Sequence, residues 1–261
     1  MNWRNTMNRA GIGVFLLSLA TVWGQSGASE PLKLETTIPM ADVQGRIDHL
    51  SVDLNSQRLF VAALGNNTVE VLDIRGAKRL HTISGLHEPQ GVLYVPGENK
   101  LFVANAKDGT CRIYDAGSFQ LLQTIEYGDD ADNIRFDAPA KQAYVGYGSG
   151  ALGVFDLSGN RLADVKLDAH PESFQLEKKG TRIFVNLPDS RKIAVVDREK
   201  KAVVGHWETG GAQANFPMAL DEASHRLFTV PAASGAHHPE YRFRSRRREN
   251  SNCRRLRRRV L

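Results

Sequence analysis

The sequence predicts an all-β protein in which four-stranded sheets repeat along the chain, the pattern of a β-propeller. Apolar and polar residues alternate in short runs bounded by Gly, Asn and Asp, which is typical of strands. No segment shows the 3.6-residue period of an amphipathic helix. The strand-like runs return about every 42 residues, which is the length of one propeller blade.

Two anchor positions define the repeat. One is an aromatic residue in the second strand of each unit: Phe60, Phe102, Tyr144, Phe184 and Phe228. The other is an aspartate that closes the third strand: Asp73, Asp115, Asp156 and Asp197. The two sets stay in step over four units, which chance does not produce.

Each unit is expected to hold four short strands. In the first unit they cover residues 48–53, 59–63, 68–73 and 78–85. Within the first strand, Leu50 and Val52 alternate with polar residues and are expected to face inward. Turns separate the strands, as at Asp108–Gly109, where a positive φ costs little. The fourth strand is more polar, as expected for the outer edge of a blade.

The segments "LFVAALGNNTVEVLD" (59–73) and "LFVANAKDGTCRIYD" (101–115) resemble the YVTN-type repeat. Over residues 34–230 the chain is therefore similar to the periplasmic YncE-like β-propeller family. The third unit departs from the motif because "YVGYGSG" (144–150) lacks its Asn, and the fourth has Asn186 one place early. The resemblance implies seven blades in an intact relative. Some similar propellers bind haem or a quinone, some are enzyme subunits, and many have no known activity.

The repeats supply about four and a half blades. The fifth unit begins with "RLFTV" (226–230), and no "VxVxD" follows it. The segment "PEYRFRSRRR" (239–248) has arginines without an apolar face, so no third strand is expected there. The chain therefore looks truncated, and an unclosed ring would expose apolar blade faces and be poorly soluble.

The chain is expected to divide into a signal peptide (1–28), an incomplete propeller (29–230) and an Arg-rich tail (231–261). Arg4 and Arg9 precede an apolar stretch that is short for a membrane span, and small residues precede a cleavage point after Ala28. We therefore expect a bacterial periplasmic or secreted protein without a stable membrane span after cleavage. The alternative is an uncleaved anchor.

The basic character of the chain belongs to its tail. The formal charge is +5, of which residues 231–261 contribute +8 and residues 1–28 contribute +2, so residues 29–230 carry −5. The tail could be a basic arm for nucleic acid or another anionic surface. We favour a frameshifted or miscalled end, because the tail has ten Arg and no Lys. We therefore expect it to be disordered, and we expect no nucleic-acid partner.

The loops that enter the first strand of each unit carry the candidate site. In a propeller these loops meet at the central channel, and every unit places polar residues there. The candidate ligand-binding residues are Asp48, His49, Gln90, Asp132, Asn133, Glu172, Ser173 and Asn215. The apolar residues that follow them are expected to pack between blades: Leu50, Val92, Ile134, Phe174 and Met218.

The residues at the channel mouth do not decide between a reactive site and a hydrated surface. Asp48, His49, Asp132, His170 and Glu172 have side chains suited to metal binding or acid–base chemistry. The competing interpretation is that a channel mouth is polar because its side chains contact water. The sequence has no paired-Cys zinc motif, HExxH, CxxCH or GxSxG, so no metal ligand or catalytic residue is assigned and the cofactor stays unknown. Cys111 is expected to be a small core residue.

These observations predict an exported scaffold that recognises a small molecule or a periplasmic protein at its channel face. The alternative functions are a metal-dependent, lactonase-like hydrolase and a cofactor-dependent oxidoreductase subunit. Whether the protein is an enzyme stays open. A third interpretation is that the chain is a truncated, non-functional product.

Overall fold

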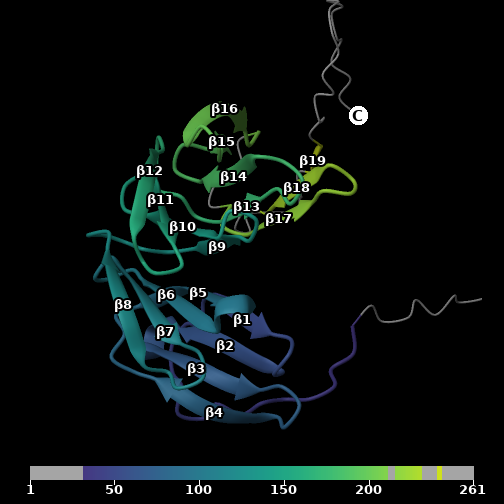
Figure 1. The fold of residues 1–261 in the computed structure, drawn as a ribbon. Helices are drawn as coiled ribbons and strands as arrows, with labels where there is room; N and C mark the ends of the chain where they lie inside the picture. Colours follow the sequence, from purple (N-terminus) through teal and green to yellow (C-terminus); the bar gives the residue numbers. More distant parts are fainter. Residues whose placement is uncertain (1–31, 211–214, 231–239, 243–261) are drawn as a thin grey trace, which may run out of the picture. The chain divides into compact units, whose positions relative to one another are not determined.

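The computed structural model describes residues 32–210, 215–230 and 240–242 (Figure 1). By its internal contacts the chain divides after Glu35, and every described strand lies in the unit that starts at Thr36. The described residues form nineteen β-strands and two short 3₁₀ turns. No helix among them is long and apolar enough to cross a membrane. The predicted signal peptide (1–28) lies outside the described residues.

The strands form five antiparallel sheets, each in chain order. The first holds β1 (Leu50–Asp53), β2 (Arg58–Ala63), β3 (Thr68–Asp73) and β4 (Lys78–Ile83). The second holds β5 (Pro89–Val95), β6 (Lys100–Asn105), β7 (Thr110–Asp115) and β8 (Leu121–Glu126). The third holds β9 (Ile134–Asp137), β10 (Gln142–Tyr147), β11 (Ala151–Asp156) and β12 (Arg161–Lys166). The fourth holds β13 (Phe174–Leu176), β14 (Arg182–Leu187), β15 (Lys192–Asp197) and β16 (Ala202–Glu208), and the fifth β17 (Met218–Asp221), β18 (Arg226–Thr229) and β19 (Glu240–Arg242).

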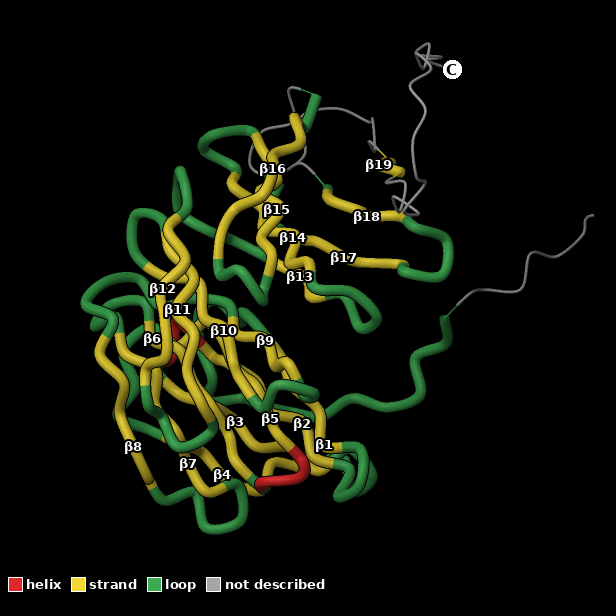
Figure 2. The backbone as a smooth tube through the Cα atoms, turned by 45° about the horizontal axis from the view of Figure 1, so that its top comes forward, coloured by secondary structure: helices red, strands yellow, loops and turns green. Residues whose placement is uncertain are grey.

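The sheets confirm the prediction of an all-β propeller with four-stranded blades. The first strands of successive blades contact one another in series, β1 with β5, β5 with β9, β9 with β13 and β13 with β17 (Figure 2). Because side chains alternate across a strand, one face of each blade packs on the next. Four apolar clusters form in this way, one at each junction between consecutive blades.

The aromatic anchors lie at these junctions. Phe60, Phe102, Tyr144 and Phe184 are buried, whereas Phe228 in the fifth blade is 37% exposed. Each of the first four is covered by the following blade, which stabilises the fold by roughly 1.5–3 kcal/mol per side chain. Phe228 belongs to the last described blade. Cys111 is a fully buried, free cysteine in one of the clusters, as predicted.

The closing aspartates recur because they hold the turn after the third strand. The Asp115 carboxylate accepts the backbone N–H groups of Gly117 and Ser118, at 3.0 and 2.7 Å. Asp156 accepts that of Ser158 at 2.8 Å. An aspartate that bonds backbone two or three residues ahead forms a tight turn without help from distant residues. The role needs a short acceptor at one fixed place, which explains the regular spacing.

The prediction that all five inner apolar residues pack between blades was wrong for Leu50. Val92, Ile134, Phe174 and Met218 are buried, but Leu50 is 56% exposed. Its strand neighbour Val52 is also largely exposed, at 42%. Both lie on the face of the first blade that no earlier sheet among the described residues covers.

The fifth blade also differs from the prediction, because it has a third strand. β19 pairs antiparallel with β18, with Tyr241 opposite Leu227. A strand edge offers unpaired N–H and C=O groups, and a neighbouring segment of the chain satisfies them whatever its sequence. This strand lies within the predicted tail. The rest of that tail, residues 231–239 and 243–261, is outside the described residues.

Candidate functional site

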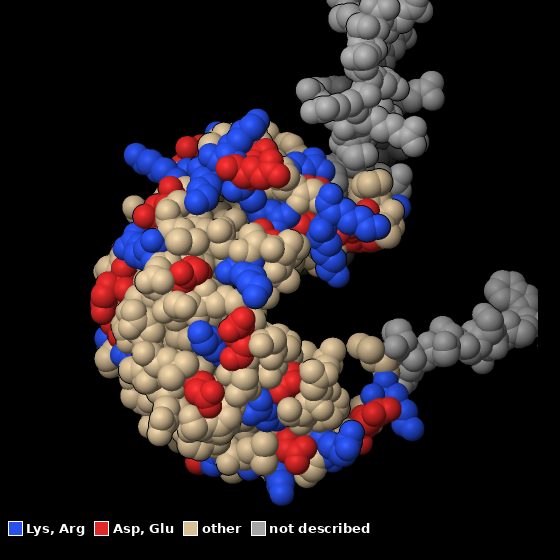
Figure 3. All heavy atoms as spheres, viewed as in Figure 1, with Lys and Arg blue, Asp and Glu red and all other residues tan. Residues whose placement is uncertain are grey.

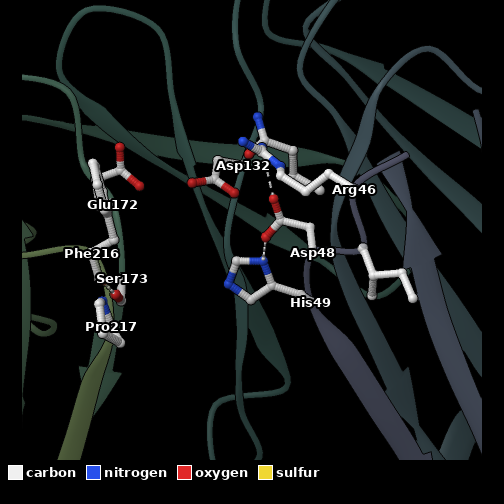
Figure 4. Close-up of a pocket in the computed structure, with 10 residues that line it drawn as sticks. Arg46, Asp48, His49, Asp132, Glu172, Ser173, Phe216 and Pro217 are labelled. Carbon is white, nitrogen blue, oxygen red and sulfur yellow. Dashed lines mark hydrogen bonds and ion pairs between the residues drawn. The ribbon is translucent and has the colours of Figure 1, made fainter. Parts of the chain in front are cut away.

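A cavity of about 440 Å³ lies where the chain enters the first strands of the blades. Residues from all five blades line it (Figure 4). Asp48, His49 and Arg46 lie together on one side of the view, and Glu172, Ser173, Phe216 and Pro217 lie on the other, with Asp132 also drawn. The described residues that line it are Arg46, Ile47, Asp48, His49, Gln90, Asp132, Glu172, Ser173, Phe216 and Pro217.

Six of the eight candidate residues from the sequence line this cavity. They are Asp48, His49, Gln90, Asp132, Glu172 and Ser173. They could be predicted because the loop before the first strand lies at the same number of residues from the aromatic anchor in every blade. Arg46, Ile47, Phe216 and Pro217 were missed as candidates, although each lies within two residues of one.

Asn133 lies behind the cavity wall. It is 1% exposed, and its Nδ2 is 2.7 Å from Nε2 of His49. It therefore contacts a lining residue and orients the imidazole.

Asn215 is not part of the cavity. It is fully buried, and its Nδ2 donates to Oδ1 of Asn186 at 2.5 Å. Asn186 donates in return to the backbone oxygen of Asn215. This exchange ties the chain before the fifth blade to β14 of the fourth blade, which is a structural role.

Asp48 is held as a carboxylate by its neighbours. Its Oδ2 lies 2.9 Å from Nη2 of Arg46, and its Oδ1 lies 2.7 Å from Nδ1 of His49. The second contact is an ion-pair distance without the alignment of a hydrogen bond, since His49 Nδ1 has no hydrogen-bond partner. Burial acts to raise the pKa of Asp48, but His49 and Arg46 outweigh it and the net shift is downward.

Asp132 has the opposite environment. It is 3% exposed, and its Oδ1 has no hydrogen-bond partner. Burial raises the pKa of its carboxyl to about 7, and the negative charges of Glu172 and Asp48 act in the same direction while His49 opposes them. A carboxyl with this pKa exchanges a proton near neutral pH.

The backbone fixes Asp132 in place. Its N–H donates to the Gly146 carbonyl at 2.8 Å, and the Gly146 N–H donates to the Asn133 carbonyl at 3.0 Å. On the other side Gly91 approaches so closely that a Cβ there would lie 2.1 Å from the Asp132 carbonyl oxygen. Glycine is required at this position because the second blade meets the loop backbone to backbone.

Glu172 adds a second carboxyl with a raised pKa. Burial is the main cause, and the nearby charges of Asp130 and Asp48 contribute while His170 opposes. His170 donates from Nδ1 to the Gly148 carbonyl at 2.5 Å and lies 3.7 Å from Asp130. The cavity is therefore acidic: among the described residues that line it, Arg46 is the one Lys or Arg.

The face of the molecule shown in Figure 3 has mixed charge. On the face shown in Figure 3, Lys and Arg side chains lie among Asp and Glu rather than in one basic band. Such a face lacks the continuous positive footprint typical of nucleic-acid binding.

No family model matches the chain. Two curated proteins are similar to it: protein NEDD1 of Mus musculus, 23% identical over 191 residues, and guanine nucleotide-binding protein subunit beta-1 of Nicotiana tabacum, 30% identical over 124 residues. The matches cover 70% and 44% of this chain. They cover 28% and 32% of those proteins, so the chain spans less than a third of the relatives it matches.

Among solved structures, the chain is similar to hydrazine synthase of Kuenenia stuttgartiensis. The TM-score is 0.62 at 17% identity, over 78% of this chain and 58% of that one. At this identity the likeness concerns the fold alone, and it agrees with a β-propeller.

Proposed function

We propose that the protein is a binding scaffold that holds a small polar molecule in the cavity at its channel mouth. One observation carries the proposal: side chains from all five blades converge on a cavity whose most buried carboxyl, Asp132, has an oxygen without a partner. A buried polar atom without a hydrogen bond costs free energy, and a ligand that donates to it recovers that cost.

The walls indicate what kind of molecule fits. A volume of about 440 Å³ lies in the usual range for small-molecule sites. Gln90 and Glu172 offer polar atoms, and Phe216 and Ile47 offer apolar contact. The acidic walls favour a ligand rich in hydrogen-bond donors or one that carries a positive charge. A concave pocket favours a small molecule over a flat protein surface.

We propose further that the protein is exported and belongs with the YncE-like propellers. The support is in the sequence: the arginine-flanked apolar stretch before Ala28, and the YVTN-like segments at 59–73 and 101–115. An exported scaffold would meet its ligand outside the cytoplasm.

The test is a thermal-shift screen of the full chain against small polar molecules, with amines and polyols included. We expect compounds that raise the melting temperature of the wild type but not of Glu172→Gln. Asp168→Asn is the matched control, because Asp168 is an exposed acid paired with His206 away from the cavity, at 3.0 Å. Compounds that stabilise Glu172→Gln and a Gln90→Ala variant as well as the wild type would overturn the proposal.

A further inference from the structure

Two loops bring three metal-binding side chains together. Asp48 and His49 come directly before β1, and Asp132 comes two residues before β9. One ligating atom from each lies within 4.8 Å of the others. In the described part of the chain this is the one group of three or more His, Cys, Asp or Glu side chains with such spacing.

The unpartnered oxygen of Asp132 points to a missing cation. Asp53 is equally buried, at 1% exposed, but Arg58 contacts it at 2.9 Å and the Ser56 N–H donates to it at 3.2 Å. Asp132 is 3% exposed and lines the cavity, and its buried Oδ1 has no such contact. Buried carboxylates are stable when paired or bound to metal.

A partly buried arginine close in sequence does not fill this role. Arg135 follows Asp132 by three residues, but its guanidinium donates to the backbone oxygen of Ile134 at 2.8 Å. It also lies over the ring of Phe174, 5.9 Å from the centroid. The charge on Asp132 is therefore not matched by a contact with this arginine.

One orientation of the Asn133 amide would free the histidine to bind a cation. With Nδ2 of Asn133 toward Nε2 of His49, the Oδ1 of Asn133 has no partner. An amide turned by 180° occupies nearly the same space. It would place Oδ1 against an Nε2–H group and leave the lone pair of Nδ1 facing Asp48, which is 2.7 Å away. Metal-bound histidines commonly donate their second ring N–H to an oxygen in this manner.

We propose that Asp48, His49 and Asp132 bind a divalent transition-metal cation of the zinc type in the wall of the cavity. One imidazole and two carboxylates favour such a cation over Mg²⁺ or Ca²⁺, which prefer oxygen alone. Three protein ligands leave a coordination position open to the cavity. The inference rests on the proposed function, because the open position would contact the small molecule bound there.

The test is a titration of chelator-treated full-length protein with Zn²⁺, followed by calorimetry and metal analysis. We expect one equivalent to bind the wild type in the cavity, and Asp132→Asn and His49→Ala to weaken this binding by about tenfold or more. His87→Ala is the matched control, because His87 Nδ1 also lies 2.7 Å from a carboxylate, that of Asp108, but outside the cavity. This variant is expected to bind as the wild type does.

The C-terminal region offers competing ligands, so it needs its own variant. Replacing His237, His238 and Cys253 with Ala is expected to leave the cavity equivalent intact. Zinc binding that survives His49→Ala but disappears in this triple variant would overturn the proposal. If a cavity variant fails to fold, Co²⁺ in the wild type decides: bands typical of nitrogen and oxygen ligands support the site, and thiolate charge transfer contradicts it.

The two proposals fail in different ways. If zinc binding depends on Asp132 but no small molecule loses its stabilising effect in Glu172→Gln, the cation site is supported and the small-molecule function is contradicted. A small molecule that depends on Glu172, with no zinc bound at Asp132, would show the reverse.

Discussion

The turn carboxylates Asp115 and Asp156 differ from the mouth carboxyls Asp132 and Glu172 in the direction of their pKa shifts, whereas the pKa of Asp48, also at the mouth, is lowered. At the turn after the third strand, hydrogen bonds from the Ser118 backbone and side chain lower the pKa of Asp115, and those from Asn160 lower the pKa of Asp156. At the channel mouth, burial raises the pKa of Asp132 and of Glu172. The first group stabilises the fold in its charged form, whereas ionisation of the second group destabilises the fold.

The sequence shows the same contrast. The closing position is aspartate in four blades, because each turn needs the same short acceptor. The mouth changes from blade to blade, with Asp48, Gln90, Asp132 and Glu172 at matching places. Repeated structure needs identical residues, whereas the proposed ligand would contact a different group on each side of the cavity.

The largest expected effect is at Asp132, in chelator-treated protein. Its ordinary pKa is 3.8 and its folded pKa is about 7, so between these values the folded state holds a proton that the unfolded state has lost. Stability should therefore fall as pH rises through this window, by at most roughly 4 kcal/mol. Asp132→Asn removes this slope and should be the more stable protein at pH 8. The charged groups around the carboxyl are Asp48, His49, Glu172, His170 and Arg135.

Urea unfolding at pH 5 and pH 8 measures this difference directly. A wild type and an Asp132→Asn variant with the same pH dependence would mean that Asp132 is ionised in the fold, as the turn carboxylates are. The contrast between the two ends of the blades would then be lost.

The next largest effect is expected from two glycines of the second blade, which lie at its opposite ends. A Cβ on Gly91 would meet the Asp132 carbonyl, whereas nothing lies within 4 Å of a Cβ on Gly97 at the opposite end of β5. We expect Gly91→Ala to lower the free energy of unfolding by about 1–3 kcal/mol, because the loop must move. Gly97→Ala should change it by less than about 0.5 kcal/mol. Equal effects in thermal unfolding would show that the mouth is not tightly packed.

The turn carboxylates should give a smaller loss. Asp156→Ala removes an acceptor for the N–H groups of Ser158 and Asn160, and should cost about 1 kcal/mol at neutral pH. Because the pKa of Asp156 is lowered in the fold, this stability is present above pH 4 and is lost as pH falls through the folded pKa. A loss that persists at pH 2 would assign the effect to something other than the carboxylate.

The smallest expected effect is a shift between neighbouring carboxyls. The charge of Glu172 is one of the causes that raise the pKa of Asp132. Glu172→Gln should therefore move the pH midpoint seen for Asp132 downward, by less than burial itself contributes. A midpoint that does not move would show that the two groups do not sense each other across the cavity.

The fold could be predicted from the sequence because the repeat is local. The aromatic anchor and the closing aspartate, such as Phe102 and Asp115, recur at the same spacing, and each acts within its own blade or on the next. Six cavity residues could be predicted by counting from the same anchors. The prediction failed where the outcome depends on distant parts of the chain: for Leu50 on whether another sheet covers its face, for Asn215 on its exchange with Asn186, and for β19 on the open edge of β18. The raised pKa of Asp132 also depends on tertiary contacts that no motif encodes.

The most direct test is a site-resolved carboxyl titration by NMR of chelator-treated protein, with the Asp132 signal assigned by its loss in Asp132→Asn. We expect Asp132 to titrate near pH 7 and Asp115 below its ordinary value, which would establish two classes of carboxyl at the two ends of the blades. If Asp132 titrates near pH 4 with the other aspartates, its carboxylate is already stabilised in the fold and the mouth holds no unfilled site.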